Sequence, residues 1–176
     1  MTSSSHIERQ ATNVLKKTGV EAPPVPVHLV AQRLGLLVES VQLGDEVSGV
    51  LVIDGEAGVI GYNASHPGVR QRFTIAHEIA HYLLHRTDSS LFIDQRYFTA
   101  FRDHRSSDGS DPREREANAF AACLLMPSQL VRREIEHQSF DLADEEGLDA
   151  LAETFQVSTQ AMAIRLSNLG LFASPA

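Results

Sequence analysis

Residues 67–86 contain the pattern that most restricts how this chain can fold. Apolar residues recur at helical spacing through PGVRQRFTIAHEIAHYLLHR, so the sequence predicts one long helix there. Apolar residues flank the centre of this segment on both sides, which indicates a buried helix with a single polar stripe. That stripe contains His77, Glu78 and His81. We expect these polar side chains to have a chemical role, the alternative being a chance match on a helix surface.

The three residues have the spacing of a metal site. His77 and His81 are four residues apart, so they project from one helix face and can bind one ion together. Glu78 is rotated by about 100° from His77 around the helix, which allows it to act as a base beside the open position of the metal. A zinc ion lowers the pKa of a water molecule to about 7. The pattern therefore predicts a zinc centre with Glu78 as general base.

A catalytic zinc ion needs a third protein ligand. The candidates are His85, His104, Glu114 and Glu116. His85 lies two turns beyond His77, roughly 12 Å away along a straight helix, so the two cannot share an ion. Glu114 has a structural explanation, because it can complete a capping box with Asp111. Glu116 has no such explanation and precedes apolar residues, so we favour Glu116 as the third ligand and keep Glu114 as the alternative.

The rest of the sequence predicts an α+β fold with helices around a small sheet. The predicted helices are residues 6–18, 27–34, 67–86, 112–126 and 128–138, followed by a helix pair near the C-terminus. LLVESVQL predicts a strand, and VSGVLVID and AGVIGYN predict a hairpin that turns at Asp54-Gly55-Glu56. We expect the 50–62 hairpin to offer an edge for an extended substrate or, equally, to be an ordinary capped edge.

Residues 87–111 show no clear period and are rich in Asp, Arg, Ser and aromatic residues. The sequence therefore predicts a long loop, and such loops in compact domains often have a function. Peptide hydrolysis needs a group that stabilises the oxyanion of the transition state. Tyr97, Arg102 and His104 are the candidates in this loop.

The length of 176 residues favours one domain at residues 1–140 with a helical appendage at 141–176. The net charge of −8 argues against a nonspecific nucleic-acid binder. Cys123 is the only cysteine, which excludes an intramolecular disulfide and a cysteine-rich metal site. No apolar stretch approaches the roughly 20 residues that cross a bilayer, so we expect a cytoplasmic protein.

The C-terminal residues 148–168 have the spacing of a helix-turn-helix. A DNA-reading unit should carry basic groups on its second helix. Arg165 is the only cation between residues 147 and 176, and the preceding helix is acidic. We therefore expect this segment to pack on the domain or to dock a protein, rather than to bind DNA.

Four segments together resemble a known family, the ImmA/IrrE metallopeptidases. They are RQRFTIAHEIAHYLLH, EREANAFAACLLMP, SGVLVIDG with VIGYN, and FRDHRSS, and the resemblance covers roughly residues 6–170. It implies a small zincin-like fold with His77, His81 and Glu116 as zinc ligands and Glu78 as general base. It also implies an intracellular protein linked to helix-turn-helix repressors, in a stress, phage or mobile-element context.

We therefore expect a zinc-dependent endopeptidase that hydrolyses a regulatory protein, in particular a helix-turn-helix repressor. The alternative is a catalytically silent, zinc-stabilised module that sequesters a repressor or a toxin–antitoxin partner. The sequence leaves the oligomeric state open, and it leaves open whether the metal is zinc or another ion that accepts two histidines and a carboxylate.

Overall fold

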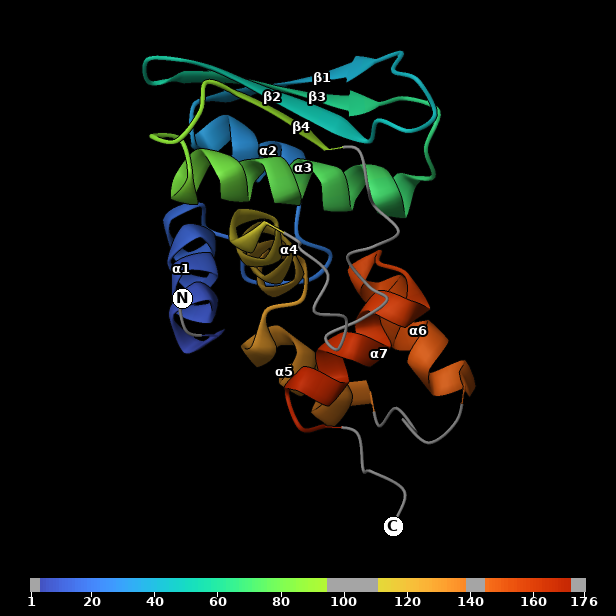
Figure 1. The fold of residues 1–176 in the computed structure, drawn as a ribbon. Helices are drawn as coiled ribbons and strands as arrows, with labels where there is room; N and C mark the ends of the chain where they lie inside the picture. Colours follow the sequence, from blue (N-terminus) through green and yellow to red (C-terminus); the bar gives the residue numbers. More distant parts are fainter. Residues whose placement is uncertain (1–3, 95–110, 139–144, 172–176) are drawn as a thin grey trace.

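The computed structural model describes residues 4–94, 111–138 and 145–171 (Figure 1). In these residues it contains seven helices and one four-stranded mixed sheet, which confirms the α+β prediction. The helices are α1 (Ser4–Lys17), α2 (Val27–Arg33), α3 (Gly68–Leu84), α4 (Pro112–Leu125), α5 (Ser128–Gln138), α6 (Glu145–Phe155) and α7 (Thr159–Asn168). The strands are β1 (Leu36–Val41), β2 (Gly49–Asp54), β3 (Ala57–Asn63) and β4 (Leu91–Asp94).

The sheet has the strand order β1-β3-β2-β4. β1 runs parallel to β3, whereas β2 is antiparallel to both β3 and β4. The predicted hairpin of β2 and β3 is confirmed, and Gly55 at its turn has a φ of +61°, a conformation that favours glycine. The Tyr82 hydroxyl of α3 donates a hydrogen bond of 2.7 Å to the Glu56 carbonyl, which ties this turn to the long helix.

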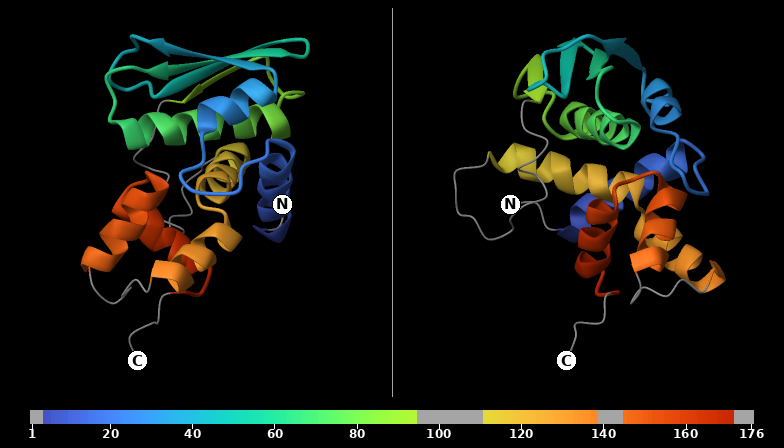
Figure 2. Two further views of the ribbon diagram at one scale, coloured as in Figure 1. Left: turned by 180° about the vertical axis from the view of Figure 1, so that it is seen from behind. Right: turned by 90° about the vertical axis from the view of Figure 1, so that its right-hand side faces the viewer.

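The elements form layers, with α3 between the sheet and α4 (Figures 1 and 2). α1 packs beside α4, and α5, α6 and α7 lie below α4, on the side away from the sheet (Figure 1). Phe73, Ile75 and Ile79 of α3 and Phe120 and Leu124 of α4 are buried in the shared core. This layering explains why α3 has almost no exposed face along its centre.

Two details of the sequence predictions were wrong. Leu91–Asp94, in the predicted loop, forms β4, because its side chains alternate and its backbone pairs with β2. The 50–62 hairpin is therefore not an edge: the edges of the described sheet are β1 and β4.

The C-terminal helices are joined to the rest of the fold by Arg165. Arg165 of α7 is buried, and its guanidinium lies 2.6 Å from the Glu8 carboxylate of α1. It also donates a hydrogen bond of 2.8 Å to the Met126 carbonyl at the end of α4. The one cation of the helix-turn-helix-like segment thus has a structural role inside the protein. The predicted division of the chain at residue 140 stays a prediction.

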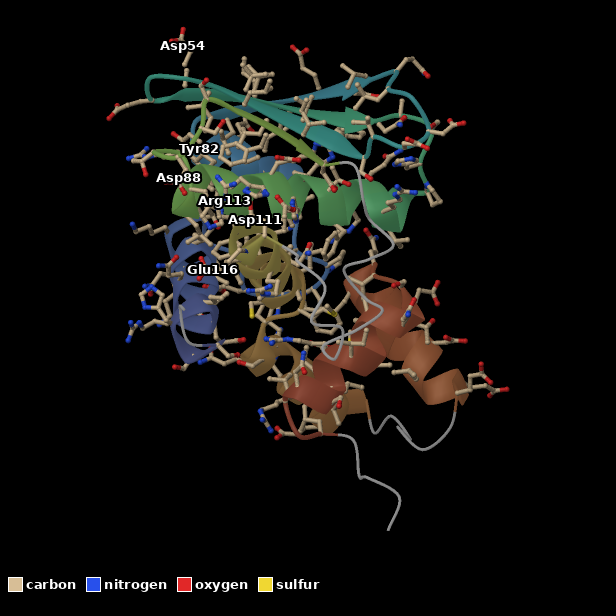
Figure 3. All side chains as sticks on the ribbon, viewed as in Figure 1. Asp54, Tyr82, Asp88, Asp111, Arg113 and Glu116 are labelled. Atoms are coloured by element: carbon tan, nitrogen blue, oxygen red, sulfur yellow. The ribbon has the colours of Figure 1, made fainter. Side chains whose placement is uncertain are left out.

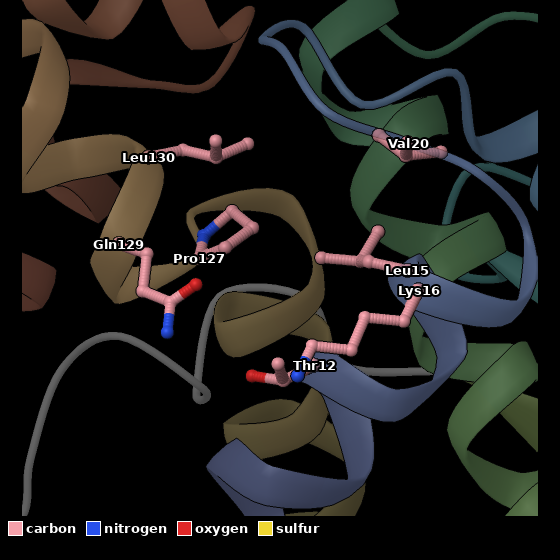
Figure 4. A pocket seen from close by; sticks show the side chains of 7 residues that line it. All are labelled: Thr12, Leu15, Lys16, Val20, Pro127, Gln129 and Leu130. Atoms are coloured by element: carbon pink, nitrogen blue, oxygen red, sulfur yellow. The ribbon is translucent and has the colours of Figure 1, made fainter.

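A small cavity of about 70 Å³ lies between α1 and the start of α5 (Figure 4). Its lining residues are Thr12, Leu15, Lys16, Val20, Pro127, Gln129 and Leu130. None of the histidines of α3 lines it, so it is separate from the expected metal site.

Among the described residues, no helix has both the length and the apolar character that crossing a bilayer requires.

Replacing Arg165 by Ala should lower the free energy of unfolding by about 3 kcal/mol, because the Glu8 carboxylate would be left without its cation in a partly buried place. Urea denaturation followed by circular dichroism measures this change. Lys17→Ala, at an exposed position of α1, is the control and should change stability by at most about 0.5 kcal/mol. A Glu8→Leu, Arg165→Met double variant should recover part of the loss, whereas a double variant as unstable as Arg165→Ala would contradict this account.

Candidate metal centre

The centre of α3 is buried on all sides. Ten consecutive residues, Phe73 to Tyr82, are buried, including His77, Glu78 and His81. Polar groups in such a place lose their hydration and must find other partners. The partners of the two histidines come from α4, from the end of α3 and from β4.

The two histidines of the motif face one another and a carboxylate. His77 Nε2 lies 2.9 Å from His81 Nε2. Both nitrogens are 3.3 Å from the Glu114 carboxylate, which presents one oxygen to each. The ligand atoms of His77, His81 and Glu114 all lie within 4.8 Å of one another. Two imidazole nitrogens and a carboxylate oxygen are the donor set of many catalytic zinc sites.

The structure corrects the choice of the third ligand: Glu114, not Glu116, lies with the two histidines. Residues 114 and 116 are about 200° apart around the helix axis, so they cannot face the same ion. Glu116 instead lies 3.3 Å from His85 Nε2, toward the C-terminal end of α3 (Figure 3). The expected capping box is only half present, because Asp111 caps α4 by accepting from the Arg113 N–H while Glu114 faces α3.

A second set of contacts orients the two histidines. His77 Nδ1 donates to the Asn118 carbonyl oxygen at 2.9 Å, which leaves Nε2 to face Glu114. His81 Nδ1 lies 3.1 Å from His85 Nδ1, and Glu116 accepts from the other nitrogen of His85. These hydrogen bonds favour the tautomers in which both Nε2 atoms can bind a metal. Glu116 thus acts on the centre through His85 and His81.

Glu78 lies beside this group with a different environment. Its side chain is fully buried, and neither carboxylate oxygen has a hydrogen-bond partner among the described residues. β2 lies close to α3 at Gly49, where an added Cβ would lie 2.3 Å from Thr74 Cγ2 and 3.2 Å from Glu78 Oε1. A side chain at residue 49 would therefore collide with Thr74 and crowd Glu78. An unpartnered, buried carboxylate next to a cation-binding set is suited to accept a proton from a substrate water.

Burial and the neighbouring charges shift the pKa values of the histidines and carboxylates in this group. Burial, reinforced by the neighbouring carboxylates of Asp94 and Glu114, raises the pKa of Glu78 to about 8. Burial alone lowers the pKa of His77, but the Glu114 hydrogen bond and the charge of Glu78 outweigh it and raise the value to about 9. Burial lowers the pKa of His81. The pKa of Glu114 is well below its ordinary value, because its hydrogen bonds to both histidines outweigh its desolvation. The carboxylates thus attract positive charge to the point where a cation would bind.

Sequence reasoning ranked Glu114 below Glu116 and missed three other contributors to the site. The three are Asn118, Gly49 and Phe92, whose ring stacks on His81 at a centroid distance of 4.6 Å. The four-residue spacing of Glu114 and Asn118 was an available signal, since such residues share a helix face. The other two come from strands, and their positions depend on the sheet. Tyr97, Arg102 and His104 lie outside the described residues and stay predictions.

Comparison with known proteins identifies the family of the chain. The family model of the IrrE N-terminal-like domain, a peptidase family designated M78, matches residues 31–167. No curated protein matches the chain significantly.

Among solved structures, a Mycobacterium tuberculosis transcriptional regulator matches 93% of this chain with a TM-score of 0.62 and 22% sequence identity. The match covers 46% of that regulator, so the chain spans about half of its length. At this identity the likeness shows a shared fold. The family match extends over most of the chain and includes both α3 and α4, which confirms the resemblance found in the sequence: the chain belongs to the M78 peptidase family of IrrE N-terminal-like domains.

Proposed function

We propose that this protein is a zinc-dependent endopeptidase. One observation carries the proposal: His77, His81 and Glu114 converge within 4.8 Å beside the buried carboxylate of Glu78, which has no hydrogen-bond partner in the described structure. A site with a purely structural metal needs no such base. The family to which the chain belongs supports the same reaction class.

The residues of the site have three different roles in peptide hydrolysis: metal binding, proton transfer and orientation of the ligands. His77, His81 and Glu114 would hold the zinc ion, which when bound supplies a Lewis acid and a water of lowered pKa. Glu78 takes a proton from the attacking water and passes it to the leaving amine. Its two buried oxygens have no hydrogen-bond partner among the described residues, so they are free to gain and to lose this proton. Asn118, and Glu116 through His85, keep the two imidazoles in their binding orientation.

The substrate we propose is an extended segment of a regulatory protein. β4 is an edge of the described sheet, and Phe92 and Asp94 from it lie beside the two histidines of α3. A peptide that paired with β4 would run past the centre. The family resemblance favours a helix-turn-helix repressor in the cytoplasm as the physiological target. Arg165, the one cation of residues 147–176, is buried in an ion pair, which argues against DNA binding there.

The choice of the third ligand can be tested by metal binding alone. Glu114→Ala should lose most of its zinc, whereas Glu116→Ala should keep about one ion per chain, because only Glu114 faces both Nε2 atoms. Native mass spectrometry after zinc loading and dialysis measures the ratio. Zinc loss from Glu116→Ala with full retention by Glu114→Ala would restore the assignment made from the sequence.

Asn118→Ala should weaken zinc affinity by roughly 10- to 100-fold, since His77 would lose the acceptor that fixes its tautomer. Competition with a chromophoric zinc chelator gives the affinity. Asn118→Asp, which keeps an acceptor oxygen at the same place, is the matched control and should recover most of it. Equal affinities of the wild type and Asn118→Ala would show that the hydrogen bond does not position His77.

Glu78→Gln should retain zinc but lower cleavage by roughly 10²- to 10⁴-fold, because the amide cannot accept the proton of the attacking water. The zinc-loaded wild type and Glu78→Gln are incubated with a peptide library from a digested bacterial proteome, and new N-termini are identified by mass spectrometry. New termini made equally by both proteins would contradict the role of Glu78. No new termini from either protein would favour the alternative, a zinc-stabilised module that sequesters its partner.

A further inference from the structure

The face of the sheet that points away from α3 is rich in exposed apolar side chains. Four of them are among the most exposed large hydrophobic residues of the described chain: Leu37 at 63%, Val52 at 48%, Leu91 at 50% and Ile93 at 51%. They come from β1, β2 and β4, at positions that alternate with the more buried residues of each strand. A solvated sheet face normally carries polar residues at such positions.

The strand register brings these side chains together. Leu37 pairs with Val59, Val59 with Val52 and Val52 with Leu91, so one apolar row crosses all four strands. Two residues further along β2 and β4, Val50 pairs with Ile93 and forms a second row. We call these six residues the outer apolar face. Neighbouring side chains in a sheet lie about 5 Å apart, so the rows form one continuous surface.

None of the described helices covers the outer apolar face. α3 contacts β2, β3 and β4 from the opposite side, and all seven helices lie on that side in the three views of the ribbon (Figures 1 and 2). Contiguous exposed apolar surface of this kind marks interaction sites in soluble proteins.

The charged residues of β1, β2, β3 and their connections are of one sign. Between Arg33 and Arg70 the chain has no lysine or arginine but five carboxylates: Glu39, Asp45, Glu46, Asp54 and Glu56. Glu39 and Asp54 lie at outward positions of β1 and β2, and Asp54 projects from the sheet away from the helices (Figure 3). An acidic rim repels a second identical face and an anionic membrane, and it attracts a basic partner.

We propose that the outer apolar face is a docking site for a basic amphipathic segment of a protein partner. Apolar side chains of the partner would cover the row from Leu37 to Leu91, and its lysines or arginines would face Glu39 and Asp54. This site lies on the side of the sheet opposite to the histidines of α3, so a partner can dock while the metal centre stays open. The proposal is independent of zinc binding and of peptidase activity.

The probe is a short fluorescein-labelled peptide of leucine and lysine with its leucines on one helix face. Fluorescence anisotropy with the full chain should show saturable binding that weakens as salt is added. The Val52→Thr, Ile93→Thr double variant keeps β-branched residues but removes apolar surface, and it should bind about tenfold more weakly. Leu29→Gln, at an exposed apolar position of α2, is the matched control and should bind like the wild type.

The charge requirement has its own control. Asp54→Lys should weaken binding of the basic peptide, whereas Glu153→Lys, on the exposed side of α6, should leave it unchanged. A peptide with glutamate in place of lysine should not bind the wild type. Thermal denaturation by circular dichroism verifies that each variant is folded.

Several results would overturn the proposal. They are no binding of the basic peptide by the wild type, equal binding by the double variant, and equal binding of the acidic peptide. Dimerisation in sedimentation experiments that Val52→Thr, Ile93→Thr abolishes would instead assign the face to a second copy. Binding to phosphatidylserine-containing vesicles that the same variant loses would assign it to a membrane.

Discussion

The burial of α3 on every side is the constraint on which the rest of this structure depends. Because the sheet covers one side and α4 the other, residues 73–82 expose at most 6% of their surface, and bulk water satisfies few of their polar groups. A buried polar group without a partner is costly, so every imidazole and carboxylate on this helix must be matched within the protein or by a ligand. The histidines are matched by α4 and by His85. Glu78 has no hydrogen-bond partner in the described residues, and this makes it the base of the proposed reaction.

Helix α4 supplies most of the matching groups from two of its faces. Glu114 and Asn118, one turn apart, meet the metal-binding pair, whereas Glu116 reaches the end of α3. The register of α4 against α3 therefore decides which carboxylate lies at the centre. Contacts far from the centre help to hold that register: α1 packs along α4, and the ion pair of Glu8 and Arg165 links α1 and α7 next to the end of α4. Stability at one end of the domain and geometry at the metal centre are thus connected through one helix.

The small sheet has two different roles on its two faces. Its inner face contributes Phe92 and Asp94 to the centre, and the close approach at Gly49 brings β2 against Glu78. Its outer face is apolar with an acidic rim and has no described cover. In the function that we propose, one layer of backbone separates the place where a peptide is cut from the place where a basic partner docks. A protein that acts on a regulator can use both, because recognition and cleavage need not share the same residues.

The sequence by itself determined what depends on neighbours along the chain. Helical periodicity, the turn at Gly55 and the four-residue spacing of His77 and His81 are local, so α3, the β2–β3 hairpin and the α+β class could be predicted. Only the tertiary structure decided which glutamate meets the histidines, because that depends on the face that α4 turns toward α3. The same holds for β4, which is too short to be recognised without its pairing to β2, and for the strand order that places it at the edge. Periodicity identifies a helix and its faces, but packing against other elements selects which face is used.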